Sequence, residues 1–203
     1  MATEATKLKI LNSALRMVGS YHIEASDETS TTYEIANRAY EQAVTELFGD
    51  NIFNYNTKRS TLTGVSGSTE FKKFSHSYTL PSDLNIILII EDEDDYLCGE
   101  YRIVNGLLYA DKTSLKITYT FVPDLASASA LPEFLTRVLT LHMAQNMAIE
   151  LSGSENRHEI LYVQYQKALK RARVLEGRQG PAQTYINEEN SQFLGGHQNY
   201  GKV

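Results

Sequence analysis

Apolar residues recur every three or four positions in four stretches of the chain, which is the spacing that places them on one face of an α-helix. In the first stretch Leu8, Leu11 and Leu15 follow this spacing, and Gly19 comes just after it, where glycine is favoured as a helix end. The helices that the spacing predicts cover about residues 6–18, 28–49, 133–151 and 154–176. They form two pairs, and we expect the pairs to pack into one bundle.

Between the two pairs, over about residues 56–122, the pattern changes to short apolar runs and alternation, which are typical of β-strands. Leu115, Ile117 and Tyr119 alternate with polar residues, and Asn105-Gly106 is a strong hairpin signal. The expected strands cover residues 57–65, 71–80, 86–90, 101–104, 107–109 and 115–122. The sequence therefore predicts an α+β fold: a mainly helical bundle of about four helices, with one small antiparallel β-sheet inserted between the two helix pairs.

The last part of the chain, from residue 178 onward, has a different composition, because Gln, Asn, Gly and Ser dominate it. Such a segment cannot bury enough apolar surface to fold alone. It carries five spaced side chains that could anchor it on a partner: Tyr185, Ile186, Phe193, Leu194 and Tyr200. Two interpretations stay open, a frayed tail and an arm that orders on a partner. We divide the chain into a domain of residues 1–178 and an extended C-terminal arm of residues 179–203.

The composition is that of a globular protein with enough apolar material for a core, because 42% of the 203 residues are hydrophobic and 22% are charged. No stretch approaches the roughly 18 apolar residues of a membrane-spanning helix. The polar N-terminus lacks the apolar middle of a signal peptide, so we expect a protein made and folded in a cytoplasm. Thirteen tyrosines and no tryptophan suit an interface, and a tyrosine-rich rim of the core explains them equally well.

The charge balance bears on nucleic acid as a partner. The net charge is −6, whereas a protein that grips a nucleic-acid backbone needs a basic footprint. The basic residues are spread along the chain, apart from a cluster at Lys167–Arg173. We therefore expect no tight DNA binding. A surface past which DNA slides without sticking is compatible with this balance.

The sequence offers no recognisable catalytic constellation. Its glycines lack the context of a phosphate-binding loop, no serine lies in a nucleophile elbow, and no pair stands out among 25 acidic residues. His142 lies on an apolar helix face, where a core or interface histidine is the ordinary case. The single cysteine, Cys98, excludes an internal disulfide and a zinc site of several cysteines. We expect no enzyme activity, no cofactor and no metal site.

An acidic run is the sharpest local feature of the sequence. It consists of Glu91, Asp92, Glu93, Asp94 and Asp95. It reads as a solvated loop, the ordinary role of a charge run. It also reads as a divalent-cation site, although it lacks the glycine and the distal glutamate of an EF-hand loop. A third interpretation is an acidic loop that lines a channel and repels DNA phosphates.

Several segments, taken in order, carry a resemblance to a known family. Phe53-Asn54-Tyr55 precedes the basic pair Lys58-Arg59, and Tyr78-Thr79-Leu80-Pro81-Ser82-Asp83 precedes the apolar run at 86–90. Further matching segments follow at residues 101–106, 111, 117–124, 151–153 and 165–176. In their order and spacing they resemble the tail tubular protein A family, the tail adaptors (head-to-tail connector ring proteins) of short-tailed bacteriophages, or podoviruses. The resemblance covers about residues 8–178, and Phe53 stands where the family usually has tryptophan.

The resemblance implies a structural protein of the virion tail, made in the host cytoplasm and placed at the head–tail junction. It implies a homo-oligomeric ring, expected to be a dodecamer, that binds the portal protein on one side. On the other side it meets a nozzle ring of the tubular protein B type, and it offers attachment surface to tail fibres. DNA would pass through its centre during ejection without specific binding. Two other functions stay open: a tail-associated cell-wall hydrolase and a non-virion accessory protein of head assembly.

Overall fold

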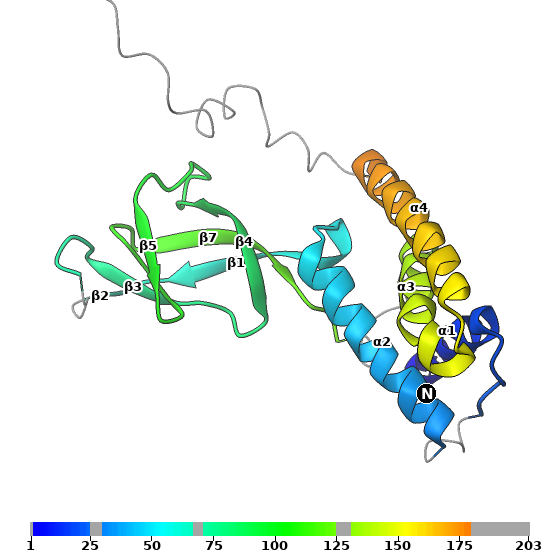
Figure 1. The fold of residues 1–203 in the computed structure, drawn as a ribbon. Helices are drawn as coiled ribbons and strands as arrows, with labels where there is room; N and C mark the ends of the chain where they lie inside the picture. Colours follow the sequence, from blue (N-terminus) through cyan, green and yellow to red (C-terminus); the bar gives the residue numbers. More distant parts are fainter. Residues whose placement is uncertain (1, 25–29, 67–70, 125–130, 180–203) are drawn as a thin grey trace, which may run out of the picture.

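A computed structural model of the chain describes residues 2–24, 30–66, 71–124 and 131–179. In these residues the fold is α+β, with four helices and two small antiparallel sheets. The helices are α1 (Ala2–Val18), α2 (Thr31–Asp50), α3 (Glu133–Ser152) and α4 (Glu155–Gln179). Figure 1 shows the helices gathered on one side of the molecule and the strands on the other. We call these two parts the helical body and the β body.

The helical body is built around α3, which packs against α1, α2 and α4. Its largest fully buried side chains are apolar: Leu11, Leu15, Leu47, Phe48, Leu135, Leu139 and Met143. α4 adds Leu161, Tyr165 and Leu169 to the same core. Because these residues recur every four positions in α3 and α4, each of these helices turns one face inward. All four helices thus share one core.

The helix ends follow capping chemistry, with some departures from the expected positions. Gly19 (φ 78°) ends α1, because its amide and the next one donate to carbonyl oxygens of the last turn, as in a Schellman motif. α2 begins later than residue 28, after the N-cap Ser30, whose hydroxyl accepts from the amide of Tyr33 at 3.1 Å. The expected end of α4 at residue 176 is wrong, since the helix continues through Gly177 to Gln179.

The β body contains two sheets in the described residues, so the expectation of one sheet is wrong. The first sheet has the order β1-β7-β4, with β1 (Thr57–Thr63), β7 (Ser114–Phe121) and β4 (Leu84–Glu91). The second has the order β2-β3-β6-β5, with β2 (Val65–Ser66), β3 (His76–Thr79), β6 (Leu107–Ala110) and β5 (Tyr101–Val104). Both sheets contribute to one apolar core: Leu62, Tyr78, Ile90, Leu108, Leu115, Ile117 and Tyr119.

The two sheets separate at Gly64, between β1 and β2. The chain pairs with β7 up to Thr63 and with β3 from Val65 onward. A Cβ atom at Gly64 would lie 2.9 Å from the Cβ of His76 and 3.0 Å from a ring carbon of Tyr78, so the close approach requires glycine. The continuous strand expected over residues 57–65 therefore breaks here.

The hairpin at Asn105-Gly106 is confirmed, because β5 and β6 pair antiparallel on either side of it. Asn105 (φ 52°) and Gly106 (φ 75°) both adopt the left-handed conformation that a two-residue type I′ turn requires. The strand expected over residues 71–80 is shorter. Residues 71–75 form turns, and β3 covers only residues 76–79.

A short 3₁₀ helix, η2 (Asn54–Asn56), joins α2 to β1. The side-chain amide of the fully buried Asn56 bonds to backbone groups at the end of α2 and in the segment that follows it. Its Nδ2 donates to Phe48 O at 2.9 Å and to Asn51 O at 3.1 Å. Its Oδ1 accepts from the amide of Phe53 at 2.8 Å. The turn between α2 and β1 is therefore held by one buried side chain.

The end of α4 is tied to the same junction. Arg173 donates to Asn51 Oδ1 at 2.6 Å, and Glu176 accepts from the amide of Asn54 at 3.1 Å. Both contacts join residues 122 positions apart in the sequence. They hold the start of the β body against the ends of α2 and α4.

Candidate interaction surfaces

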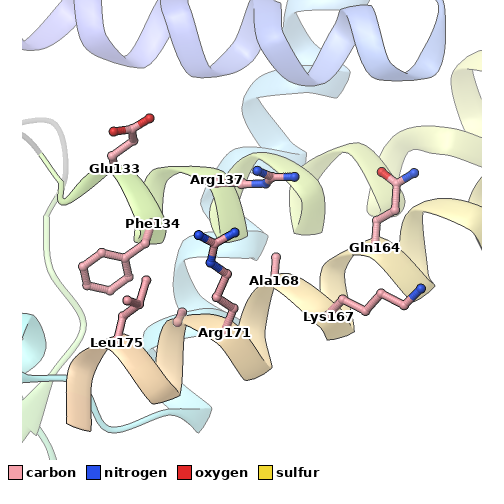
Figure 2. Close-up of a pocket in the computed structure, with 9 residues that line it drawn as sticks. Glu133, Phe134, Arg137, Gln164, Lys167, Ala168, Arg171 and Leu175 are labelled. Carbon is pink, nitrogen blue, oxygen red and sulfur yellow. The ribbon is translucent and has the colours of Figure 1, made fainter. Parts of the chain in front are cut away.

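A groove of about 650 Å³ lies between α3 and α4 of the helical body. Figure 2 shows its lining, with Phe134 and Leu175 at one end and Gln164 and Lys167 at the other. Arg171 extends from α4 toward α3 (Figure 2). The floor between these side chains is formed by small residues, which leave the space open. We call this the α3–α4 groove.

The α3–α4 groove is cationic although the chain as a whole is acidic. Arg137, Lys167 and Arg171 line it, are exposed, and form no ion pair in the described part of the chain. Glu133 is the one carboxylate among its lining residues. Arg173, which belongs to the same basic cluster in the sequence, instead bonds to Asn51 at the junction. The fold thus separates the cluster into a structural contact and an exposed cationic surface.

A second groove of about 340 Å³ lies between the end of α1 and the start of α4. Met17 and Ile160 line it and are 41% and 50% exposed. Arg157 also lines it and donates to the carbonyl oxygen of Val18, which fixes α4 against the end of α1. Gln164 lines this α1–α4 groove and the α3–α4 groove, so the two are neighbours along α4.

The β body exposes apolar side chains around its edge strand β5. Tyr96 and Leu97, which precede β5, are 71% and 60% exposed. Tyr101 and Ile103 of β5 are exposed on one side of the strand. β5 is the last strand of its sheet, so one of its backbone edges has no partner strand in the described residues. We call these four side chains the β5 surface, and such a surface is typical of a contact with another chain.

The acidic run forms a tight hairpin turn after β4. The amide of Asp95 donates to Asp92 O at 3.2 Å, and Asp95 itself has a positive φ of 64°. Asp92 Oδ1 accepts from the amides of Asp94 and Tyr96, both at 3.1 Å. These bonds are those of an Asx turn, for which aspartate is one of the favoured residues. The aspartate at position 92 is therefore explained by the turn that its side chain stabilises.

Cations from β1, from β7 and from the turn between β6 and β7 neutralise most of this loop. Glu91 pairs with Arg59 at 2.7 Å and Asp92 with Lys112 at 3.0 Å. A third carboxylate, Asp95, pairs with Arg59 and with Lys116. Hydrogen bonds from Lys112 and Lys116 lower the pKa of Asp92 and of Asp95, respectively, so both carboxylates stay ionised at neutral pH. Within the described residues, three of the five carboxylates are in ion pairs.

The remaining two acidic side chains of the loop, Glu93 and Asp94, are exposed and have no cation partner in the described part of the chain. The described residues contain no group of three or more His, Cys, Asp or Glu side chains that could hold a metal ion. Glu93 and Asp94 are therefore the accessible negative charge of this loop.

His142 is a core residue of the helical body, one of the two ordinary roles considered for it. It is 7% exposed, and its Nε2 lies 2.9 Å from Glu46 Oε2 of α2. Its ring stacks on Tyr165 of α4, with 4.4 Å between ring centroids. Burial lowers the pKa of His142 in spite of the nearby Glu46 carboxylate, so the ring is neutral at pH 7. It links three helices rather than facing a cavity.

The residues that carry the family resemblance lie mainly in the framework. Phe53 is buried and meets the ring of Phe48 edge-on, with 6.1 Å between centroids. Tyr78 is fully buried and donates to the carbonyl oxygen of Lys112. Lys58 and Asp83 come from two separate motif segments and form an ion pair at 2.7 Å in an exposed position.

The anchor residues of the arm, Tyr185, Ile186, Phe193, Leu194 and Tyr200, lie outside the described residues. No protein-family model matches the chain, and no curated protein matches it. No helix in the described ranges is both long and apolar enough to cross a membrane.

Proposed function

We propose that the chain is a structural protein of a bacteriophage virion and not an enzyme: a ring-forming tail adaptor between the portal and the tail nozzle of a short-tailed phage. Copies of the chain form a ring, expected to be a dodecamer, at the head–tail junction. The ring binds the portal protein above and the nozzle below, offers a platform for fibres, and encloses the channel through which DNA leaves. The chain needs no cofactor for this role.

The observation that carries the proposal is the β5 surface. Two of its side chains, Tyr101 and Ile103, lie on the edge strand, and Tyr96 and Leu97 precede it. Exposed apolar side chains beside an open backbone edge disfavour a free monomer and favour contact with a second chain. The helical body also exposes apolar side chains, such as Ile149 (52%) and Tyr162 (46%). A head-to-tail ring requires two different surfaces on each subunit, and exposed apolar residues on both bodies fit that requirement.

Contacts between the segments that carry the family resemblance also support the proposal. Lys58 and Asp83 lie in different segments of the resemblance and meet in space. Phe53 and Asn56 fix the turn that connects the two bodies. Residues that contact one another across the fold give a resemblance more weight than isolated short matches. The proposed adaptor subunit also includes the arm of residues 179–203 and a β body inserted between two helix pairs.

In the proposed ring, the acidic loop is a candidate for the surface that faces the DNA channel. If the loop faces the channel, its effect on DNA comes from Glu93 and Asp94, since the other three carboxylates are ion-paired. Replacing both by the corresponding amides removes the accessible charge and leaves those ion pairs intact. The expected result is slower DNA ejection with normal ring assembly. Normal ejection kinetics by this variant would assign the loop to simple solvation.

The test of the proposal is the mass in solution of the chain, alone and mixed with the portal protein of the same phage. We expect a complex that contains about twelve copies of the 22.9 kDa chain. Leu97→Lys should weaken assembly, because Leu97 belongs to the β5 surface, whereas Ile52→Lys should not. The two positions are matched, at 60% and 59% exposed, and Ile52 lies outside the β5 surface. A chain that stays monomeric with the portal would refute the adaptor role.

Two other functions have their own tests. A zymogram with cell-wall substrate that shows lysis would favour a tail hydrolase. Absence of the chain from purified virions would favour an accessory protein of head assembly. Either result would replace the adaptor proposal.

A further inference from the structure

The α3–α4 groove and the α1–α4 groove form one path along α4, because Gln164 lines both of them. The chemistry of the lining changes twice along this path. Leu175 provides an apolar end near the C-terminus of α4, and Arg171 and Lys167 provide a cationic middle. At the other end, Met17 and Ile160 provide apolar side chains beside the polar Ser154, Asn156 and Arg157. Apolar side chains therefore lie at both ends of the path, with the two groove cations between them.

The same order appears on one face of α4. Ile160, Lys167, Arg171 and Val174 are separated by seven, four and three positions, so their side chains project from the same side of the helix. All four are exposed, and Ile160 and Val174 are 50% and 51% exposed. A helix face that only meets water does not need apolar residues at both ends of a cationic stretch. The face is therefore suited to a segment with the matching order of apolar and acidic residues.

The C-terminal arm has that matching order. Tyr185-Ile186 is an apolar pair, Glu188-Glu189 is the acidic pair of the arm, and Phe193-Leu194 is a second apolar pair. We propose that residues 185–194 pack along α4 of their own chain, running opposite to the helix. The first apolar pair then lies at Leu175, the acidic pair at the two groove cations, and the second apolar pair in the α1–α4 groove.

The lengths of the arm and of the path agree. An extended chain advances about 3.3 Å per residue, so the acidic pair lies about 10 Å beyond the first apolar pair and the second apolar pair about 17 Å further. An α-helix advances about 1.5 Å per residue, so the midpoint of Lys167 and Arg171 lies about 9 Å from Leu175 and about 13 Å from Ile160. The two sets of spacings differ by only a few ångströms, which a slightly kinked segment absorbs.

The short connection favours the same chain over a second copy as the donor of the arm. Only five residues, 180–184, separate the end of α4 from Tyr185. They begin with Gly180-Pro181, where proline ends a helix and glycine permits a reversal of direction. A short tether gives an effective concentration in the millimolar range, above that of a second copy in a dilute solution. The inference goes beyond the adaptor role and does not depend on it.

The experiment uses the absence of tryptophan from the sequence. Phe193→Trp introduces one fluorophore into the proposed contact, and Tyr200→Trp introduces a matched one outside it, in the full chain. We expect Phe193→Trp to emit at shorter wavelength and to be less accessible to iodide than Tyr200→Trp. The difference should not change when the protein is diluted. Equal emission and equal quenching of the two variants would refute the proposal.

A charge reversal on α4 tests the acidic pair. Lys167→Glu with Arg171→Glu, in the Phe193→Trp background, should lower the ratio of packed to released arm roughly tenfold, because two ion pairs are replaced by repulsion. Lys170→Glu is the control, since Lys170 is exposed on the same helix but does not line either groove. An unchanged emission after the double reversal would overturn the proposed register. A blue shift that disappears on dilution would overturn the assignment to the same chain and point to exchange between copies.

Discussion

Replacing Asn56 with alanine should destabilise the protein much more than the same replacement two residues earlier. Asn56 is fully buried and makes three hydrogen bonds to the backbone at Phe48, Asn51 and Phe53. Alanine leaves two carbonyl groups and one N–H group without this partner. Each hydrogen bond contributes about 1 kcal/mol net, and a buried group left unsatisfied costs about 1–3 kcal/mol. We expect the free energy of unfolding to fall by about 3 kcal/mol.

Asn54→Ala is the matched control for this change. Asn54 belongs to the same 3₁₀ helix but is exposed, and it reaches Glu176 through its backbone amide, which alanine keeps. The control should change the free energy of unfolding by less than about 0.5 kcal/mol. Urea titration followed by far-UV circular dichroism measures both variants. In a chain of this length the Asn56 variant should also melt about 6–12 °C lower.

The reasoning fails if the two variants unfold within about 0.5 kcal/mol of each other with the same dependence on urea. That result would mean that the junction between α2 and β1 is held by the apolar packing of Phe53 alone. Phe53→Leu would then be the more damaging change, and the buried amide would have no measurable share in joining the two bodies.

Titratable side chains elsewhere in the fold give three smaller tests, all by urea titration. Burial lowers the pKa of His142 in the folded protein, so the unfolded chain binds the proton at a higher pH than the folded one. The free energy of unfolding should therefore fall as the pH drops through the ordinary histidine pKa of about 6.5. His142→Phe should make this fall smaller. Lys58 lowers the pKa of Asp83, so the pair stabilises above the ordinary aspartate pKa and is lost in acid. Because the pair is exposed, Asp83→Asn should cost less than about 1 kcal/mol at neutral pH, and a larger cost would contradict the exposure. Asp94→Ala should leave the urea midpoint unchanged, whereas Asp92→Ala should lower it because it removes the oxygen that accepts from the amides of Asp94 and Tyr96, and equal midpoints would contradict the turn geometry.

The elements of the fold follow from local patterns in the sequence, and their boundaries follow less well. Helical spacing identifies α1 to α4, and Asn105-Gly106 identifies the β5–β6 hairpin, because both signals depend on residues close together in the chain. The two sheets separate at Gly64, which lies against His76 and Tyr78. That contact joins strands whose pairing the sequence does not reveal, so the sequence favours the simpler prediction of a single sheet.

The candidate site is predictable only in part for the same reason. Lys167 and Arg171 are four positions apart, so the sequence alone is enough to place them on one side of a helix. Arg137 joins them only because α3 and α4 pack together. The acidic loop shows the opposite case. Its negative charge is evident in the sequence, but its neutralisation by Arg59 and Lys112 depends on contacts between segments that are far apart in the chain.

The residues that carry the resemblance and the residues that would make the contacts of an adaptor overlap only in part, because Tyr101 and Ile103 of the β5 surface lie in a matching segment and Leu97 does not. Phe53 and Tyr78 are buried, so changes there alter the stability of the fold. Leu97 and Ile160 are exposed and lie between the motif segments, so they can change without loss of the fold. A resemblance in the framework therefore bears mainly on architecture, and the surfaces have to be tested directly. An assembly defect in Leu97→Lys with unchanged stability would separate the function of the chain from its fold.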